Sequence, residues 1–213
     1  MHLTIINETV IEYKFSNTIS LDLSETILKI YRYLMEHLDF QTLGLLKITP
    51  CFNSIAIAFT SSSPLFDAPD FLRETLLQAH ESTEKNIYKT HTIKLIYDGL
   101  DLDYVCQTLK LSQKEFIQRH QKNTYTIAML GFKGNFPYLL GLDKGLVLPR
   151  RASPRNRVSK GSVAIGGDQC GIYVEDSPGG WHIIANTHFT DFACLEAGDK
   201  IVFKAIITEG KKC

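Results

Sequence analysis

The stretch from Pro149 to Trp181 reads PRRASPRNRVSKGSVAIGGDQCGIYVEDSPGGW. It begins with five cations and has no acidic residue before Asp168; the cations are Arg150, Arg151, Arg155, Arg157 and Lys160. Pro149 and Pro154 restrict the backbone, so we expect a stiff loop that presents guanidinium groups. Clustered cations repel one another, and planar guanidinium groups match the oxygens of carboxylates and phosphates. The loop therefore predicts a site for an anion or a partner carboxylate, with a solvated basic loop as the equally weighted alternative.

Short apolar runs lie on both sides of this loop, and Gly, Pro and Asp residues separate them. The runs with strand character are Thr124–Leu130, Ser162–Ile165, Gly171–Glu175, Trp181–Ala185 and Ile201–Ile207. Many short strands with turn residues between them are typical of a β-barrel or a β-sandwich.

The first hundred residues alternate strands with helices. Ser20 can cap a helix with apolar residues at helical intervals, and Pro69 suits the first turn of a second helix. The expected strands are His2–Ile6, Val10–Phe15, Leu43–Ile48, Ser54–Phe59 and Thr92–Tyr97. Two helices on one antiparallel-rich sheet form a small α+β layer architecture.

We place the domain boundary between Tyr97 and Asp101. This gives a fold of the α+β class, with a small N-terminal α/β sandwich domain at residues 1–98 and a β-barrel domain at residues 99–213. Two helices open the second domain. Asp101 is expected to cap the first, and Ser112 with Glu115 has the pattern of a capping box that opens the second.

The composition of the chain argues against several classes of function. The net charge is zero, with four excess negative charges in residues 1–100 and four excess positive charges in residues 101–213. This imbalance is too small for a general nucleic-acid binder. The five cysteines form no CxxC pair, which argues against a zinc site and a disulfide framework. With no signal peptide and no run long enough to cross a bilayer, we expect a cytoplasmic protein without a membrane partner.

Some candidate residues also have ordinary structural interpretations. The segment 131–139 combines glycines with aromatic residues, which suits either a turn over the barrel mouth or a pocket wall. The segment 166–171 lacks the lysine and Ser/Thr of a P-loop, although Gln169 could hydrogen-bond an amide. Trp181 is first of all a core residue, and His120 at a helix end is more often structural than catalytic. Nothing near Cys170 in the sequence nominates a base, so we do not assign it as a nucleophile.

A series of motifs then occurs in one order along the chain. They are His120-x4-Tyr125, Phe136-Pro137-Tyr138-Leu139, Pro149-Arg150-Arg151, Gly161-Ser162-Val163, Gln169-x-Gly171-Ile172-Tyr173 and Ser177-Pro178-Gly179-Gly180-Trp181. In order and approximate spacing the chain resembles the family of 5-oxoprolinase B subunits, also called KipI-like or allophanate hydrolase subunit 1-like. The resemblance is strong from about residue 100 to residue 206.

The resemblance implies a cyclophilin-like β-barrel after an N-terminal α/β domain. It also implies an ATP-dependent 5-oxoprolinase, in which this chain, a homologous C subunit and a separate A subunit open 5-oxoproline to glutamate. ATP, with Mg in the assembled complex, would phosphorylate the lactam carbonyl before water attacks. Such chemistry needs cations against phosphate and carboxylate, and donors for the developing oxyanion.

The resemblance also implies the site residues. The expected catalytic residues are His120 as a proton shuttle, Arg151 against the anionic groups and Gln169 as an oxyanion donor. The residues expected to bind substrate or nucleotide are Phe136, Tyr138, Arg150, Arg155, Tyr173, Gly179, Gly180 and Trp181. No metal ligands are expected in this chain.

The chain departs from the family pattern at several positions of these motifs: Gly134, Asn135, Leu148, Lys160, Cys170 and Asn186. Two other functions also follow from the resemblance. One is a KipI-like regulatory protein that inhibits a sensor histidine kinase. The other is a carboxyltransferase-type subunit acting on a urea- or allophanate-like amide, which would need separate biotin-carrying subunits.

Overall fold

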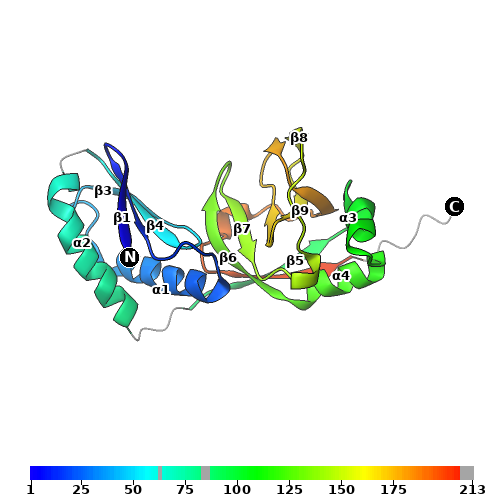
Figure 1. Ribbon diagram of the computed structural model, residues 1–213, viewed down its shortest axis with the longest axis horizontal. Coiled ribbons are helices and arrows are strands. Elements are labelled where there is room, and N and C mark those ends of the chain that lie inside the picture. Colours follow the sequence, from blue (N-terminus) through cyan, green and yellow to red (C-terminus); the bar gives the residue numbers. More distant parts are fainter. Residues whose placement is uncertain (62–63, 83–86, 207–213) are drawn as a thin grey trace. The chain divides into compact units, whose positions relative to one another are not determined.

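The computed structural model describes residues 1–61, 64–82 and 87–206. The chain divides into two compact units, Met1–Ile87 and Tyr88–Cys213 (Figure 1). The architecture is mixed α/β in both units. None of the helices within the described ranges has the length and apolar character needed to cross a membrane.

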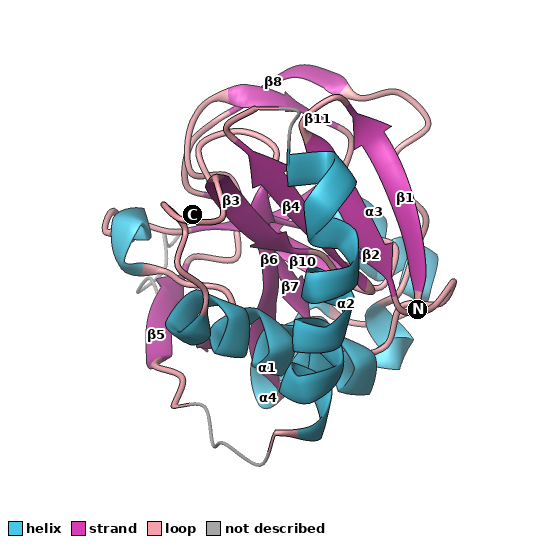
Figure 2. Cartoon of the chain, turned by 90° about the vertical axis from the view of Figure 1, so that its left-hand side faces the viewer, coloured by secondary structure: helices cyan, strands magenta, loops and turns pink. Residues whose placement is uncertain are grey.

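The first unit is a four-stranded antiparallel sheet with two helices packed together against it (Figure 2). Its strand order is β1-β2-β4-β3, and Ser20 caps α1 by accepting a hydrogen bond from the backbone N–H of Leu23, as expected. Apolar residues from the helices and from alternate strand positions form one core. The elements are β1 His2–Asn7, β2 Val10–Lys14, α1 Leu21–His37, β3 Leu45–Pro50, β4 Ser54–Phe59 and α2 Pro64–Glu81.

The start of α2 corrects the sequence interpretation. The helix begins at Pro64, so Pro69 lies beyond its first turn. Proline is favoured in the first turn of a helix. Pro64, and not Pro69, occupies the first turn of α2. Leu72 and Leu76 face the core as their helical spacing predicts.

The second unit is built on a seven-stranded sheet that curls into a half-barrel, with strand order β12-β9-β10-β7-β6-β13-β5. All neighbouring pairs are antiparallel except β13 and β5, which run parallel. The strands are β5 Thr90–Leu95, β6 Thr124–Gly131, β7 Phe136–Leu140, β9 Ser162–Gly166, β10 Gln169–Ile172, β12 His182–Asn186 and β13 Lys200–Ala205. Ile207, the expected end of the last strand, lies outside the described residues. A single curled sheet favours the barrel expectation over the two-sheet sandwich.

One strand belongs to a different unit than the sequence suggested. We expected a strand near Thr92–Tyr97 to complete the first sheet, but β5 pairs with β13 in the second unit. Immediately after β5, Ile96 exchanges two backbone hydrogen bonds with Asn186 at the end of β12. The first and last strands of the order are therefore joined at one point, where the curled sheet comes back on itself.

Two α-helices, two short 3₁₀-helices and a two-stranded ribbon complete this unit. The capping box of Ser112 and Glu115 is confirmed at the start of α4. Asp101 precedes α3 as expected, but its side chain makes no capping hydrogen bond and is engaged elsewhere. The elements are α3 Leu102–Leu109, α4 Gln113–Lys122, η1 Lys144–Leu146, β8 Arg155–Val158, β11 Ser177–Gly179 and η2 Phe192–Cys194, with β8 and β11 paired antiparallel.

Candidate functional site

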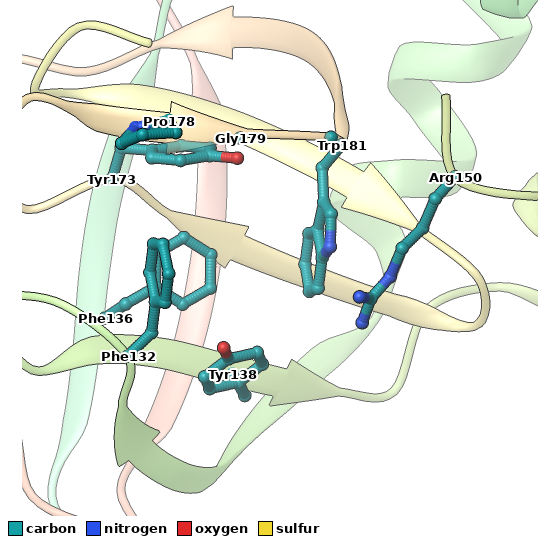
Figure 3. Close-up of a pocket in the computed structure, with 9 residues that line it drawn as sticks. Phe132, Phe136, Tyr138, Arg150, Tyr173, Pro178, Gly179 and Trp181 are labelled. Atoms are coloured by element: carbon teal, nitrogen blue, oxygen red, sulfur yellow. The ribbon is translucent and has the colours of Figure 1, made fainter. Parts of the chain in front are cut away.

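A cavity of about 200 Å³ opens within the second unit (Figure 3). Aromatic side chains form most of its wall, and one arginine contributes a positive charge. Its lining residues are Phe132, Phe136, Tyr138, Arg150, Tyr173, Pro178, Gly179, Gly180 and Trp181. Most of them come from β7, from the turn before it, and from the segment around β11.

Strand pairing explains why the aromatic residues meet. Tyr138 on β7 lies opposite Gly171 on β10, so the two positions share one face of the sheet. A side chain at Gly171 would overlap the ring of Phe136, since an added Cβ would lie 2.3 Å from its Cζ atom. The missing side chain lets the Phe136 ring lie over β10. Phe136 then contacts Tyr138, Tyr173 and Trp181 edge-on, with ring centroids 4.8–5.5 Å apart.

Arg150 supplies the positive charge of the cavity. Its guanidinium carbon lies 5.3 Å from the centroid of the Trp181 ring, within the range of a cation–π contact. Burial raises the pKa of Tyr138 and the pKa of Tyr173 above the ordinary tyrosine value, while the nearby charge of Arg150 opposes both shifts. Both phenols therefore stay protonated at neutral pH and can donate hydrogen bonds.

Arg151 and Arg155 have a different role from the one we expected. Both bind the buried carboxylate of Asp101, at 2.8–2.9 Å, and Arg155 does so with two nitrogens. The Asp101 Oδ2 atom also accepts a hydrogen bond from the backbone N–H of Ile183 at 2.8 Å. Burial alone would raise the pKa of Asp101, but the hydrogen bonds and the two guanidinium charges hold it below its usual value. The partner carboxylate of the basic loop is thus part of this chain.

His120 lies in the core of the unit and not at the cavity. Its side chain is fully buried, with Nδ1 2.7 Å from the Tyr97 hydroxyl, Nε2 3.5 Å from the Cys170 sulfur and its ring stacked on Phe203. Burial lowers the pKa of His120 to about 3, so the imidazole is neutral. Burial also raises the pKa of Cys170, so its thiol stays protonated. Both are core groups, which removes the proton shuttle from the candidate site.

Gln169 lies near cavity-lining residues in the sequence, but it does not line the cavity. Its Oε1 atom is buried and has no hydrogen-bond partner within the part of the chain that the structure describes. On β10 it alternates with Cys170, so it shares the face of Gly171 and not the face that contacts His120. The structure places all three expected catalytic residues, His120, Arg151 and Gln169, outside the cavity lining.

The residues expected to bind substrate or nucleotide, in contrast to the expected catalytic residues, lie together in the structure. Seven of the eight line this one cavity, and only Arg155 does not. Two further lining residues, Phe132 and Pro178, were not among the expected binding residues. Pro178 belongs to the motif at 177–181, and Phe132 belongs to the segment 131–139, which combines glycines with aromatic bulk and suited either a turn or a pocket wall. That combination is the signal that could have identified Phe132.

The residues that depart from the family pattern are not among those that line the cavity. Gly134 and Asn135 both have positive φ, in the turn between β6 and β7. Leu148 pairs with Gly167 at a single bridge, and the Asn186 amide donates a hydrogen bond to Asp98. With Cys170 in the core, none of these substitutions changes a residue that lines the cavity.

Gly179 and Gly180 offer a matched test of how tightly the cavity wall is packed. An added Cβ at Gly179 would lie 2.1 Å from the Tyr173 hydroxyl oxygen, whereas at Gly180 the nearest atom lies at 3.6 Å. We expect Gly179→Ala to displace the Tyr173 ring and to lower the free energy of unfolding by about 1–3 kcal/mol. Gly180→Ala is expected to stay within about 0.5 kcal/mol of the parent. Urea unfolding followed by tryptophan fluorescence measures both, and equal effects of the two variants would contradict this packing.

Comparisons with known proteins show the family of this chain. The family model for the carboxyltransferase domain, subdomain C and D, matches residues 1–200. The chain is 43% identical over 128 residues to the B subunit of 5-oxoprolinase from Haemophilus influenzae, a match that covers 55% of this chain and 59% of the relative. It is 32% identical over 184 residues to the corresponding B subunit from Bacillus subtilis, with 76% of each chain covered.

The fold is shared with a solved structure. The crystal structure of TTHA0988 superposes with a TM-score of 0.78 at 27% sequence identity. The match covers 92% of this chain but only 39% of that protein. The chain thus matches a little over half of the Haemophilus relative and well under half of the crystallised protein.

Proposed function

Since this chain belongs to the carboxyltransferase domain family, subdomain C and D, and to its branch of 5-oxoprolinase B subunits, we propose that it is the B subunit of a 5-oxoprolinase. In the proposed reaction the cyclic amide of 5-oxoproline is opened to glutamate with hydrolysis of ATP. The proposed partners are a homologous C subunit and a separate A subunit. The observation that supports a direct role for this chain is the cavity lined by Arg150 and aromatic rings.

The cavity residues have clear tasks in such a reaction. Arg150 offers a cation to the substrate, and the protonated phenols of Tyr138 and Tyr173 offer hydrogen-bond donors. The rings of Phe136 and Trp181 exclude water from one side of the bound molecule and strengthen these polar contacts. The chain thereby binds and orients a small substrate.

The cavity does not fit ATP with its magnesium ion. At about 200 Å³ it is below the roughly 300–1,000 Å³ of pockets that hold drug-sized ligands. Arg150 is the one cation among its lining residues, while a triphosphate carries several negative charges. The proposal therefore assigns nucleotide binding to another part of the assembled enzyme.

Co-expression with candidate A and C subunits tests the proposed function. The purified complex should release glutamate from 5-oxoproline only when ATP is supplied, and omission of this chain should abolish the release. An intact complex that consumes no 5-oxoproline would contradict the proposal.

Carboxyl transfer to an amide is a second candidate, because the matching family model is described as a carboxyltransferase domain. In that case, labelled bicarbonate should be incorporated into urea or a related amide when biotin-carrying subunits are present. Release of glutamate without bicarbonate would favour the 5-oxoprolinase.

A further inference from the structure

Three of the five cations of the basic loop form ion pairs with carboxylates of the chain. Arg151 and Arg155 hold Asp101, and Arg157 binds the Asp176 carboxylate. The Lys160 ammonium lies 5.7 Å from the centroid of the Phe192 ring. Arg150 makes no ion pair with the residues that the structure describes, and its side chain is exposed at the cavity. Of Arg150 and Lys160, only Arg150 lines the cavity, so it is the cation of this loop that is placed to meet a ligand there.

The backbone on both sides of Arg150 is fixed. The Pro149 carbonyl accepts a hydrogen bond from Nε2 of His182 at 3.0 Å. The backbone N–H of Arg151 donates to the Gly180 carbonyl at 2.8 Å, next to the cavity wall. The guanidinium itself lies over the Trp181 ring. A ligand that binds Arg150 would meet a group already held in place, which lowers the entropic cost of binding.

We propose that Arg150 is the anion-binding residue of the cavity and that the ligand is a small monocarboxylate with a compact, weakly polar body. This inference rests on the proposed function and assigns a residue to it. One guanidinium matches one carboxylate through two parallel hydrogen bonds. The aromatic wall and the volume of about 200 Å³ suit a single five-membered ring, and they do not suit a nucleoside triphosphate.

The test uses the full chain and titrates it with 5-oxoproline, its neutral carboxamide and ATP. Trp181 is the sole tryptophan of the sequence, so its fluorescence reports on the cavity, and calorimetry gives the affinity independently. Arg150→Gln should weaken binding of 5-oxoproline roughly 10- to 100-fold, because a hydrogen-bonded charge is lost. The same variant should bind the neutral carboxamide as the parent does. Arg157→Gln, the matched control on an exposed arginine, should change neither affinity.

Three results would overturn the inference. These are equal affinities of Arg150→Gln and the parent for 5-oxoproline, displacement of 5-oxoproline by ATP, and no binding either to the chain or to its co-purified complex. The failure of the proposed function would look different. A complex that binds 5-oxoproline through Arg150 without turning it over refutes the function and leaves the site, whereas turnover with a KM unchanged by Arg150→Gln refutes the site and leaves the function.

Discussion

Replacing Asp101 with asparagine is expected to lower the free energy of unfolding by about 3 kcal/mol, a shift of roughly 6–12 °C in the melting temperature. Asp101 is 5% exposed and its two oxygens receive hydrogen bonds from Arg151, Arg155 and the Ile183 backbone. The asparagine would turn an amide N–H group toward guanidinium donors and leave both cations without a counter-charge. Urea unfolding followed by the fluorescence of Trp181, which lies in the same unit, measures the change.

The exposed pair of Arg157 and Asp176 provides the control. Its side chains are 77% and 43% exposed, so Asp176→Asn should cost less than about 1 kcal/mol. A second control places Asp101→Asn in a chain that already carries Arg151→Gln and Arg155→Gln. There the loss should shrink, because the unpaired cations are gone. A loss below about 1 kcal/mol in the parent chain would mean that Asp101 does not hold the basic loop.

The chain is expected to lose stability as the pH falls from 7 to 5, and His120 should account for about 2 kcal/mol of that loss. In the unfolded chain the imidazole takes up a proton near its ordinary pKa of about 6.5. In the folded chain burial lowers the pKa of His120 to about 3, so it stays neutral. Between these values the unfolded state binds more protons, so stability is lost as the pH falls and regained as it rises.

Unfolding free energies at pH 7 and pH 5 test this for the parent and for His120→Gln. The variant removes the titrating group, so its loss between the two pH values should be smaller by about 2 kcal/mol, whatever its stability at pH 7. His188→Gln, at an exposed histidine, should keep the full pH dependence of the parent. An unchanged pH dependence in His120→Gln would show that another group governs acid sensitivity.

Local patterns in the sequence predicted most of the secondary structure. The strand at Ser54–Phe59 and the capping box at Ser112 occur as expected, because alternation and capping depend on residues close in the chain. Most of the residues that the family motifs predicted to bind substrate or nucleotide line the cavity, for a related reason. Where an aromatic ring packs closely against the backbone, the sequence has a glycine, as at Gly171 and Gly179.

Long-range pairing could not be predicted in the same way. Asp101 lies fifty residues before Arg151, and nothing local distinguishes an acidic cap from a carboxylate that binds arginines. The apolar run around β5 would suit either sheet, and only the register with β13 decides between them. His120 illustrates a third limit. Its position four residues after the buried Phe116 indicates a core face of the helix, but a motif containing histidine suggested chemistry instead.

The parallel pair of β5 and β13 has a consequence for the order of events on the ribosome. β5 is the first strand of its sheet to be synthesised and β13 the last, yet they are neighbours. At typical rates of translation β5 waits roughly 5–20 s for this partner, with both edges open to other chains. The four strands of the first unit pair with strands nearby in sequence and can fold during that wait. We therefore expect synthesis of the second sheet to end in a late docking step, with the nascent chain most exposed to aggregation just before it.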